Sequence, residues 1–301
     1  MENEVADGQQ LLSLVNLLEE QVRELEVATR LAESSGLCTL DLACRGFDRL
    51  VNSQGVRGQT LEAAFVLVVG VGNIGSLLVD GLARAGIGAV GVLDRGEVRT
   101  HEVSGGVFGM QHVGVNKADC IKRVVQLVNP LVQVHACTAD VTKTNRETYP
   151  LSELCLSMGC GKPDLVVCCI KGAEQRLSTA SWCLQNNVPL TDLETSSQLG
   201  DVSVRTFAKG FQKSCLRCYK AQRSGEPQDE NKDFHDAFLP ATNLLVAGLL
   251  LQQVIKALSL DFPADAECSH ISRYSVLKDM FEVTPLSGLM SCKCDASPPP
   301  K

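Results

Sequence analysis

A glycine-rich turn is the group of residues in this chain whose spacing points most directly to chemistry. The segment Gly70-Val71-Gly72-Asn73-Ile74-Gly75 follows an apolar run and precedes a helical pattern. In such a turn, the backbone N–H groups and the start of the helix can bind phosphate. Asp94 follows the next apolar run, where a carboxylate can accept hydrogen bonds from ribose hydroxyls. Together these residues predict a nucleotide site.

A pair of cysteines predicts a second kind of site. Cys215 and Cys218 have two residues between them, a gap that lets both thiolates reach one zinc ion. Other cysteines, such as Cys168 and Cys169, lie in an apolar run where cysteine acts as a small hydrophobic residue. The spaced pair therefore predicts half of a tetrahedral zinc site.

An α/β fold is needed to position the glycine turn. Strands are expected at 65–69 and 89–93, with a helix between them that starts after the turn. This order favours a parallel sheet. Further apolar patterns predict helices over 117–128, 172–186 and 241–258, a helical or loop segment over 138–160, and strands over 131–135, 164–170, 188–193 and 199–208. We expect a Rossmann-like, mostly parallel sheet with helices on both faces.

The chain is expected to divide into a helix, one large domain and a short tail. Residues 1–40 hold an amphipathic helix over 9–34, because apolar residues recur there at three- and four-residue spacing. Residues 41–295 form the α/β domain, with a polar crossover loop at 219–238, and 296–301 are expected to be a disordered tail. Helix 241–258 is so strongly apolar that we expect it to be buried.

The composition argues against several classes of protein. A length of 301 residues with 45% hydrophobic content is enough for one large core. The net charge of −7 argues against a nucleic-acid partner. Fourteen cysteines without an apolar signal peptide at the start predict reduced thiols in a cytoplasmic protein. The apolar run 244–255 is too short to span a bilayer, so no membrane association is expected.

Several motifs occur in an order that resembles a known superfamily. The glycine turn and Asp94 are followed by Asn129-Pro130, then by the cysteine pair, and then by Leu239-Pro240-Ala241-Thr242 at the start of the apolar helix. This set resembles the ThiF/MoeB/ubiquitin-activating superfamily. Within it, the chain is most similar to the small single-domain activating enzymes of ubiquitin-fold modifier, over residues 10–295.

The resemblance implies a chemistry and a set of ligands. Such enzymes adenylate the C-terminal carboxylate of a ubiquitin-like modifier with ATP and Mg²⁺, and many then hold it as a thioester. The residues that match the family's nucleotide positions are Gly70, Gly72, Gly75, Asp94 and Lys117, with Arg49 in a matched N-terminal segment. Asn73 belongs to the same candidate site but replaces the glycine usual there, which restricts approach to the phosphates. The resemblance also implies a homodimer, a modifier or conjugating-enzyme partner, and a second zinc-binding pair. Cys292 and Cys294 are the candidates for that pair, with Cys268 or His270 as substitutes.

The positions that carry catalysis in the family are changed in this chain. The family's Asn-x-Asn-Arg segment falls on Glu102-Val103-Ser104-Gly105, so its phosphate-contacting arginine is absent. Lys171 stands where the family has the aspartate that contacts Mg²⁺, and its positive charge argues against that ion. His235 stands at the position of the catalytic cysteine. Arg176 matches a family arginine, with a structural salt bridge as the competing interpretation.

Three functional readings stay open at this point. The first is a catalytically degenerate member that acts as a nucleotide-binding or regulatory subunit. The second is an active, diverged activating enzyme with rearranged ligands. The third is an NAD-dependent oxidoreductase that uses the same glycine turn, although the cysteine pair and Leu239-Pro240-Ala241-Thr242 argue against it.

Overall fold

A computed structural model of the chain describes most of the predicted α/β domain. The described residues are Arg23, 61–142, 150–159, 161–195, 202–207, Leu216, 240–258, 270–275 and 280–285. By its contacts the chain divides into two units, Met1–Leu50 and Val51–Lys301. In the first unit Arg23 is helical and exposed. The rest of the predicted helix 9–34 lies outside the described residues, as do the 219–238 loop and the 296–301 tail.

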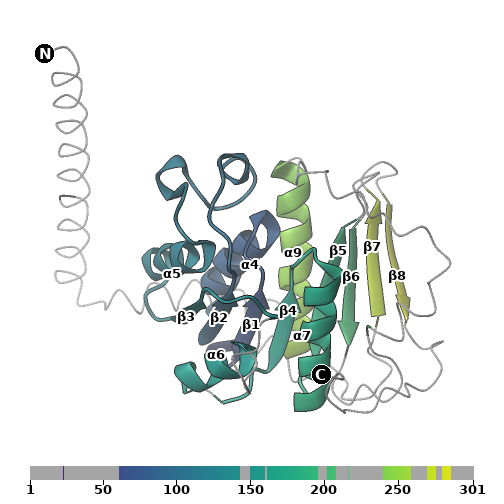
Figure 1. The fold of residues 1–301 in the computed structure, drawn as a ribbon. Coiled ribbons are helices and arrows are strands. Elements are labelled where there is room, and N and C mark those ends of the chain that lie inside the picture. The colour runs from purple at the N-terminus through teal and green to yellow at the C-terminus, as the bar shows by residue number, and fades with distance from the viewer. Residues whose placement is uncertain are drawn as a thin grey trace, which may run out of the picture. The chain divides into compact units, whose positions relative to one another are not determined.

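An eight-stranded sheet forms the centre of the second unit, in the order β3-β2-β1-β4-β5-β6-β7-β8 (Figure 1). The strands are β1 Phe65–Val69, β2 Ala89–Leu93, β3 Gln133–Cys137, β4 Leu165–Cys168, β5 Leu190–Thr195, β6 Val202–Phe207, β7 His270–Ser275 and β8 Met280–Pro285. The first five strands in sequence pair in parallel, whereas β6, β7 and β8 extend the sheet with antiparallel pairs. The predicted Rossmann-like α/β fold is confirmed.

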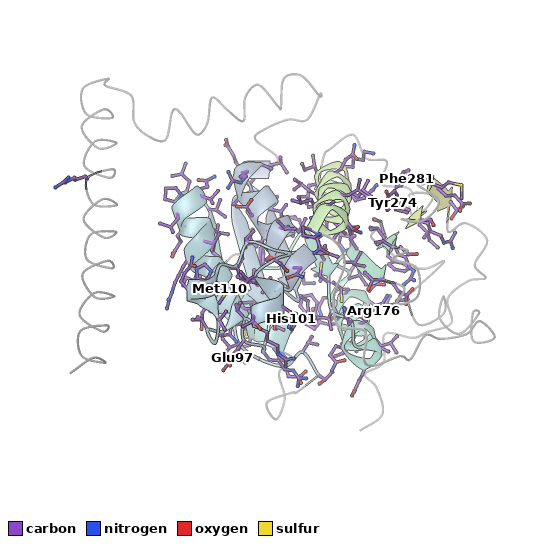
Figure 2. All side chains as sticks on the ribbon, turned by 90° about the horizontal axis from the view of Figure 1, so that it is seen from above. Glu97, His101, Met110, Arg176, Tyr274 and Phe281 are labelled. Carbon is purple, nitrogen blue, oxygen red and sulfur yellow. The ribbon has the colours of Figure 1, made fainter. Side chains whose placement is uncertain are left out.

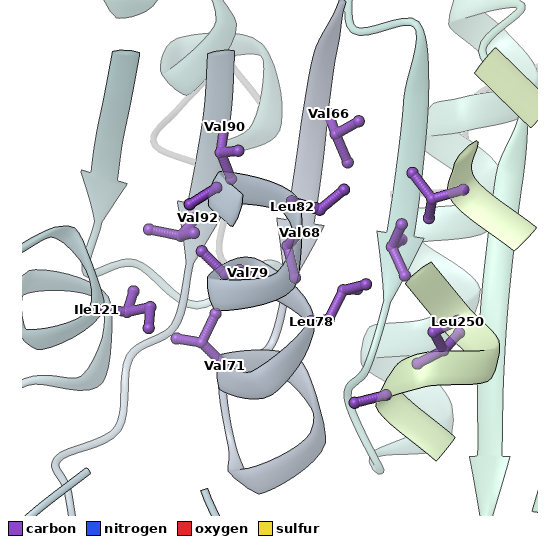
Figure 3. Packing of buried hydrophobic residues seen from close by; sticks show 14 of the residues in the cluster. Val66, Val68, Val71, Leu78, Val79, Leu82, Val90, Val92, Ile121 and Leu250 are labelled. Carbon is purple, nitrogen blue, oxygen red and sulfur yellow. The ribbon is translucent and has the colours of Figure 1, made fainter. Parts of the chain in front are cut away.

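Helices cover both faces of the parallel strands, which explains the continuous apolar runs. The helices are α4 Asn73–Arg84, α5 Lys117–Val128, α6 Pro150–Met158, α7 Ala173–Asn186 and α9 Pro240–Leu258, with short 3₁₀ helices η1 Thr100–Glu102 and η2 Met110–His112. In β1, Val66 and Val68 pack with α4, α5 and α9, while Leu67 and Val69 pack with α6 and α7. Figure 3 shows the first of these two clusters. Since successive side chains of a strand point to opposite faces, a strand buried on both sides must be apolar throughout.

The sequence predicts best the bounds of those elements that begin and end at residues with a clear local preference. β1, β2 and α5 have the predicted bounds. Helix α5 begins after Asn116, whose side-chain oxygen accepts hydrogen bonds from the N–H groups of Ala118 and Asp119. It ends at Asn129-Pro130, and the Asn129 side chain donates to the carbonyl of Ala83 at 2.9 Å. Strands β3 and β5 start later than predicted, at Gln133 and Leu190, where their pairing with neighbouring strands begins.

Helix α9 is buried on one side and exposed on the other, so the expectation of a buried helix is confirmed in part. Val246, Leu250 and Val254 are buried on the side that packs against the sheet and α4. Leu244 and Leu245, by contrast, are 59% and 43% exposed. Within the described part of the chain, α9 is the one helix long and apolar enough to cross a membrane by length and composition alone. Its close packing on α4, where Leu251 lies against Gly81, is that of a core helix.

A buried network of charges stabilises the junction between β5, β6 and α7. Asp192 accepts hydrogen bonds from Arg176 Nε at 2.9 Å and from Arg205 Nη1 at 3.0 Å. Glu194, on the same strand, pairs with both arginines. The Asp192 side chain is fully buried, and those of the two arginines are at most 5% exposed. The two positive and two negative charges therefore compensate one another, three of them away from water and the fourth, Glu194, at 39% exposure.

Replacing Asp192 should destabilise the domain strongly. In Asp192→Asn the arginines lose a charged partner while they stay buried, which costs about 3–5 kcal/mol. The matched control is Asp80→Asn, because Asp80 pairs with Arg84 in a surface pair in which the Arg84 side chain is 64% exposed. Such a pair contributes about 1 kcal/mol or less. Urea unfolding followed by circular dichroism measures both, and equal midpoints for the two variants would contradict the structural role of the network.

Candidate nucleotide site

Two glycines make the turn between β1 and α4 sterically possible. Gly70 has φ of 90°, a left-handed conformation that favours glycine. A Cβ atom on Gly70 would also lie 2.7 Å from the side chain of Ile170, just after β4. A Cβ atom on Gly75 would lie 2.1 Å from the carbonyl oxygen of Gly70. The turn therefore packs directly on β4, and the first turn of α4 packs directly on the turn.

The N-terminus of α4 has the properties of an anion site. Its N-cap residue is Gly72, and no described side chain caps the helix. Gly72 and Asn73 are partly exposed, and the first turn of the helix carries no acidic side chain. The N–H groups of a first helical turn have no partner within the helix, and the helix dipole places partial positive charge there. Phosphate is the ligand class that this arrangement fits.

Asp94 fastens the end of β2 to the glycine turn. Its Oδ2 accepts a hydrogen bond from the N–H of Val71 at 2.9 Å, and its Oδ1 accepts one from the N–H of Gly96 at 2.8 Å. Each carboxylate oxygen can accept a further hydrogen bond. Asp94 thus stabilises the turn through two backbone hydrogen bonds, and its contact with a ribose stays a prediction.

Lys117 and Glu102 form an ion pair beside the turn. The distance from Lys117 Nζ to Glu102 Oε1 is 2.5 Å, and the two side chains are 15% and 5% exposed. Glu102 Oε2 also accepts a hydrogen bond from the N–H of Arg99 at 2.9 Å. A Cβ atom placed on Gly72 would lie 3.9 Å from Glu102 Oε1, so this carboxylate lies close to the N-cap of α4. The lysine predicted to hold phosphate is therefore paired with a carboxylate.

Gly105 lies in a space that two asparagine side chains close. A Cβ atom on Gly105 would be 2.6 Å from Asn73 Nδ2 and 2.7 Å from Asn243 Nδ2. Asn243 also donates a hydrogen bond to the carbonyl oxygen of Gly105 at 3.0 Å. An arginine at this position would require the two amides to move. Asn73 and Gly105, two positions at which the chain departs from the family, therefore lie next to each other in the structure.

Lys171 and Arg176 lie beyond the end of β4 and have different surroundings. Lys171 is exposed in part, and the protein around the rest of its side chain lowers the pKa of the amine through desolvation. Arg176, in α7, is held by Asp192 and Glu194, so the salt-bridge interpretation of this residue is confirmed. In Figure 2, Arg176 is labelled to the right of Glu97, His101 and Met110, which belong to the segment between β2 and α5.

The described cysteines of α6, β4 and α7 do not have the properties of nucleophiles. Cys155, Cys160 and Cys183 are alternative thiols that could substitute for the missing catalytic cysteine. Cys155 and Cys183 are buried in α6 and α7. Burial raises the pKa of Cys183 well above its usual value and that of Cys168 to about 12. Since the thiolate is the reactive form, these groups are inert at neutral pH. Cys160, a third alternative thiol, lies outside the described residues.

Several predicted site residues cannot be placed. Arg49, His235, Cys215, Cys218, Cys268, Cys292 and Cys294 lie outside the described residues. His270 begins β7, and Leu216, between the first two cysteines, is helical and buried. Among the side chains that the structure describes, no three His, Cys, Asp or Glu residues gather as metal ligands. The zinc site stays a prediction.

Sequence reasoning missed three residues that shape this region. Glu102 was noted only as a replacement for a family asparagine, and Asn243 and Asp192 were not singled out. The cue for Glu102 was its place in a segment where an uncharged residue was expected next to a phosphate site. Asn243 lies in an apolar helix and Asp192 in an apolar strand. A polar residue in such a position indicates a buried hydrogen bond or ion pair, and this could have identified both residues.

Comparison with known proteins assigns the family. The model described as "ThiF family" matches residues 47–296, most of the 301-residue chain. The chain therefore belongs to the ThiF family. This membership favours the adenylating-enzyme fold over that of an NAD-dependent oxidoreductase.

Related proteins and solved structures agree with that assignment. "Ubiquitin-like modifier-activating enzyme 5" of Drosophila virilis is 28% identical over 233 residues, which cover 75% of this chain and 57% of that protein. The protein of the same name from Caenorhabditis elegans is 28% identical over 221 residues, covering 72% and 52%. This chain thus spans a little over half the length of these curated relatives.

The similar solved structures show the fold alone, because their identities are low. The structure titled "Crystal Structure of SeMet PaaA" has a TM-score of 0.62 at 17% identity and covers 87% of this chain and 91% of that one. The structure of Escherichia coli MccB with ATP has a TM-score of 0.61 at 18% identity, covering 79% and 67%.

A methyl group at Gly105 should destabilise the protein. Gly105→Ala places a Cβ against the amides of Asn73 and Asn243, and such overpacking costs about 1–3 kcal/mol. Asn73→Gly should recover part of that loss in the double variant, because it opens the space on one side. The control is Gly248→Ala in α9, where no atom lies within 4 Å of the added Cβ. Its stability should stay the same or rise by about 1 kcal/mol. The midpoint of thermal unfolding measures the stability of each variant. An unchanged midpoint for Gly105→Ala would show that the space between Asn73 and Asn243 admits a methyl group.

Proposed function

We propose that this ThiF-family chain is a nucleotide-binding or regulatory protein of a ubiquitin-like modifier pathway, with little or no adenylation activity. The observation that carries the proposal is the amine of Lys171, which follows β4 after Cys169 and Ile170, at the position where the family resemblance calls for a Mg²⁺-binding carboxylate. A cation at this position repels a divalent ion. The region around the turn therefore retains the means to bind a nucleotide but lacks a group needed to activate it.

Adenylation depends on stabilising charge that moves among the phosphates. A metal ion and an arginine supply this stabilisation, and removing one such group commonly reduces the rate by about 10²–10³. Lys171 replaces the metal ligand, and Gly105 replaces the arginine, in a space where the amides of Asn73 and Asn243 would have to move to admit a side chain. His235 offers an imidazole where a thiol would be needed for a thioester. Two changes therefore act against adenylation, and the third acts against the thioester step that follows it.

Nucleotide binding has its own support in the structure. The glycine turn brings the backbone close to a ligand, and α4 presents an uncapped N-terminus among the described residues. Asp94 keeps acceptor capacity for a ribose. These residues would hold ATP, which would supply a phosphoanhydride to activate a carboxylate. The residues fit the adenosine and first-phosphate part of such a ligand better than its metal-bound part.

The remaining assignments follow the relatives. Their name supports a ubiquitin-like modifier as the partner. A conjugating-enzyme partner and a cytoplasmic location are further parts of the proposal, and the location follows from the reduced thiols expected of the cysteines. A homodimer is supported by the exposed Leu244 and Leu245 at the start of α9, since a contact there would remove apolar surface from water. The net charge of −7 gives the chain no excess of basic residues, so we expect neither a nucleic acid nor a membrane as its partner.

The purified chain should show little or no ATP–pyrophosphate exchange with ubiquitin-like modifiers. Exchange reports the adenylation step alone, before any thioester forms. A reconstruction that combines Asn73→Gly, Gly105→Arg and Lys171→Asp restores the family residues together with the space for the arginine. We expect exchange in this variant to exceed that of the unmodified chain, with Gly105→Arg alone as the control that misfolds or stays inactive. Robust exchange and a thiol-sensitive conjugate in the unmodified chain would instead support the active enzyme with rearranged ligands.

Zinc should bind at about one ion per chain through Cys215, Cys218, Cys292 and Cys294. Structural zinc contributes folding energy, so Cys215→Ser with Cys218→Ser should release the metal and lower the unfolding temperature. The matched control is Cys120→Ser in α5, which removes a buried thiol outside the proposed zinc pair. Elemental analysis of the purified protein measures the metal. A metal-free chain with unchanged stability after the double substitution would refute the site.

A further inference from the structure

We infer that the carboxylate of Glu102 restricts the glycine turn to adenine ligands with few or no phosphates, such as adenosine or AMP, and disfavours ATP. This inference deepens the proposed nucleotide binding and rests on it. It assigns to Glu102 the role of a specificity-determining residue. The observations that carry it are the place of this carboxylate next to Gly72 and its pairing with Lys117.

Among the three charged side chains that lie close together beside the turn, the negative charges outnumber the positive one, whereas Lys171 lies apart from them after β4. Asp94 contributes one negative charge, Glu102 another, and Lys117 a single positive charge. A Cβ atom on Gly96 would lie 3.2 Å from Asp94 Oδ1 and 3.7 Å from Lys117 Nζ, so these groups share one small region. The lysine that would attract phosphate is neutralised by Glu102 at 2.5 Å. A phosphate that enters here therefore meets no net positive side-chain charge from these three residues.

Glu102 is also fixed in place. Its side chain is 5% exposed, and it ends the 3₁₀ helix η1. One carboxylate oxygen pairs with Lys117, and the other accepts a hydrogen bond from the N–H of Arg99. Moving the side chain away would leave the Arg99 N–H without this partner and Lys117 without its ion pair. The negative charge therefore stays beside the turn when a ligand arrives.

The position of that charge determines which ligands it affects. Gly72 is the N-cap of α4, and the phosphate nearest the turn would lie at this end of the helix. Glu102 Oε1 lies 3.9 Å from the Cβ position of Gly72. Like charges a few ångströms apart in a partly buried site repel strongly, and each additional phosphate adds to that repulsion. The adenosine moiety carries no charge and is unaffected.

The test is a titration of the full chain with adenosine, AMP, ADP and ATP, each with and without Mg²⁺, by isothermal calorimetry. The unmodified chain should bind adenosine or AMP at least as tightly as ATP. In Glu102→Gln, which keeps the size of the side chain, the affinity for ATP should rise by at least about tenfold and that for adenosine should stay within about twofold. If the Glu102→Gln protein does not fold, Glu102→Ala serves as the second variant. Glu97→Gln, which removes a charge from an exposed position of the same segment, should change neither affinity.

The outcomes separate this inference from the proposed function. If ATP binds the unmodified chain tightly and Glu102→Gln does not improve it, the inference fails while nucleotide binding stands. If Glu102→Gln abolishes Mg²⁺-dependent binding of ATP, Glu102 is a metal ligand and the inference is again overturned. If no adenine ligand binds any variant, both the inference and the proposed nucleotide binding fail. Circular dichroism of the ligand-free variants establishes that each one is folded.

Discussion

The structure depends on how closely α4 approaches the end of β1. The first turn of the helix lies against the carbonyl of Gly70, at a distance that no side chain on Gly75 would permit, and Gly70 in turn lies against the chain that leaves β4. Three elements thus meet at one point with almost no side-chain volume between them. This contact aims the helix N-terminus at the carboxyl edge of the sheet, which is where open α/β sheets bind ligands. The rest of the candidate site is arranged around that edge.

Charged groups near this edge are mostly engaged with one another. Asp94 braces the turn, Glu102 holds Lys117, and Asp192 with Glu194 holds two arginines. In an adenylating enzyme, some of these charges would be expected to face the ligand instead. Charges that are satisfied within the protein stabilise a fixed arrangement, and they leave fewer groups to respond when phosphates shift. The charged groups at this edge accordingly act first as structural contacts between its elements.

The sequence predicted those features that local chemistry determines. Glycine spacing, β-branched runs and Asn129-Pro130 act within a few residues, and they gave the bounds of β1, β2 and α5. Strand β5 extends to Thr195 because it pairs there with Val202 of β6, which no local pattern reveals. The same limit applied to the site. Asn243 reaches Gly105 across 138 residues of sequence, and Glu102 meets Lys117 only because η1 and α5 come together.

The sheet also implies an order of assembly. Strand β2 follows β1 through α4 alone, and β3 follows β2 through η1, η2 and α5, so these pairings form between neighbouring segments of the sequence. Strand β6 instead pairs with β7 through partners such as Val202 and Tyr274, and the long α9 lies between them in the chain. Closing a longer loop costs more entropy before any contact compensates for it. We therefore expect the N-terminal strands to form the folding nucleus, with β7 and β8 added last.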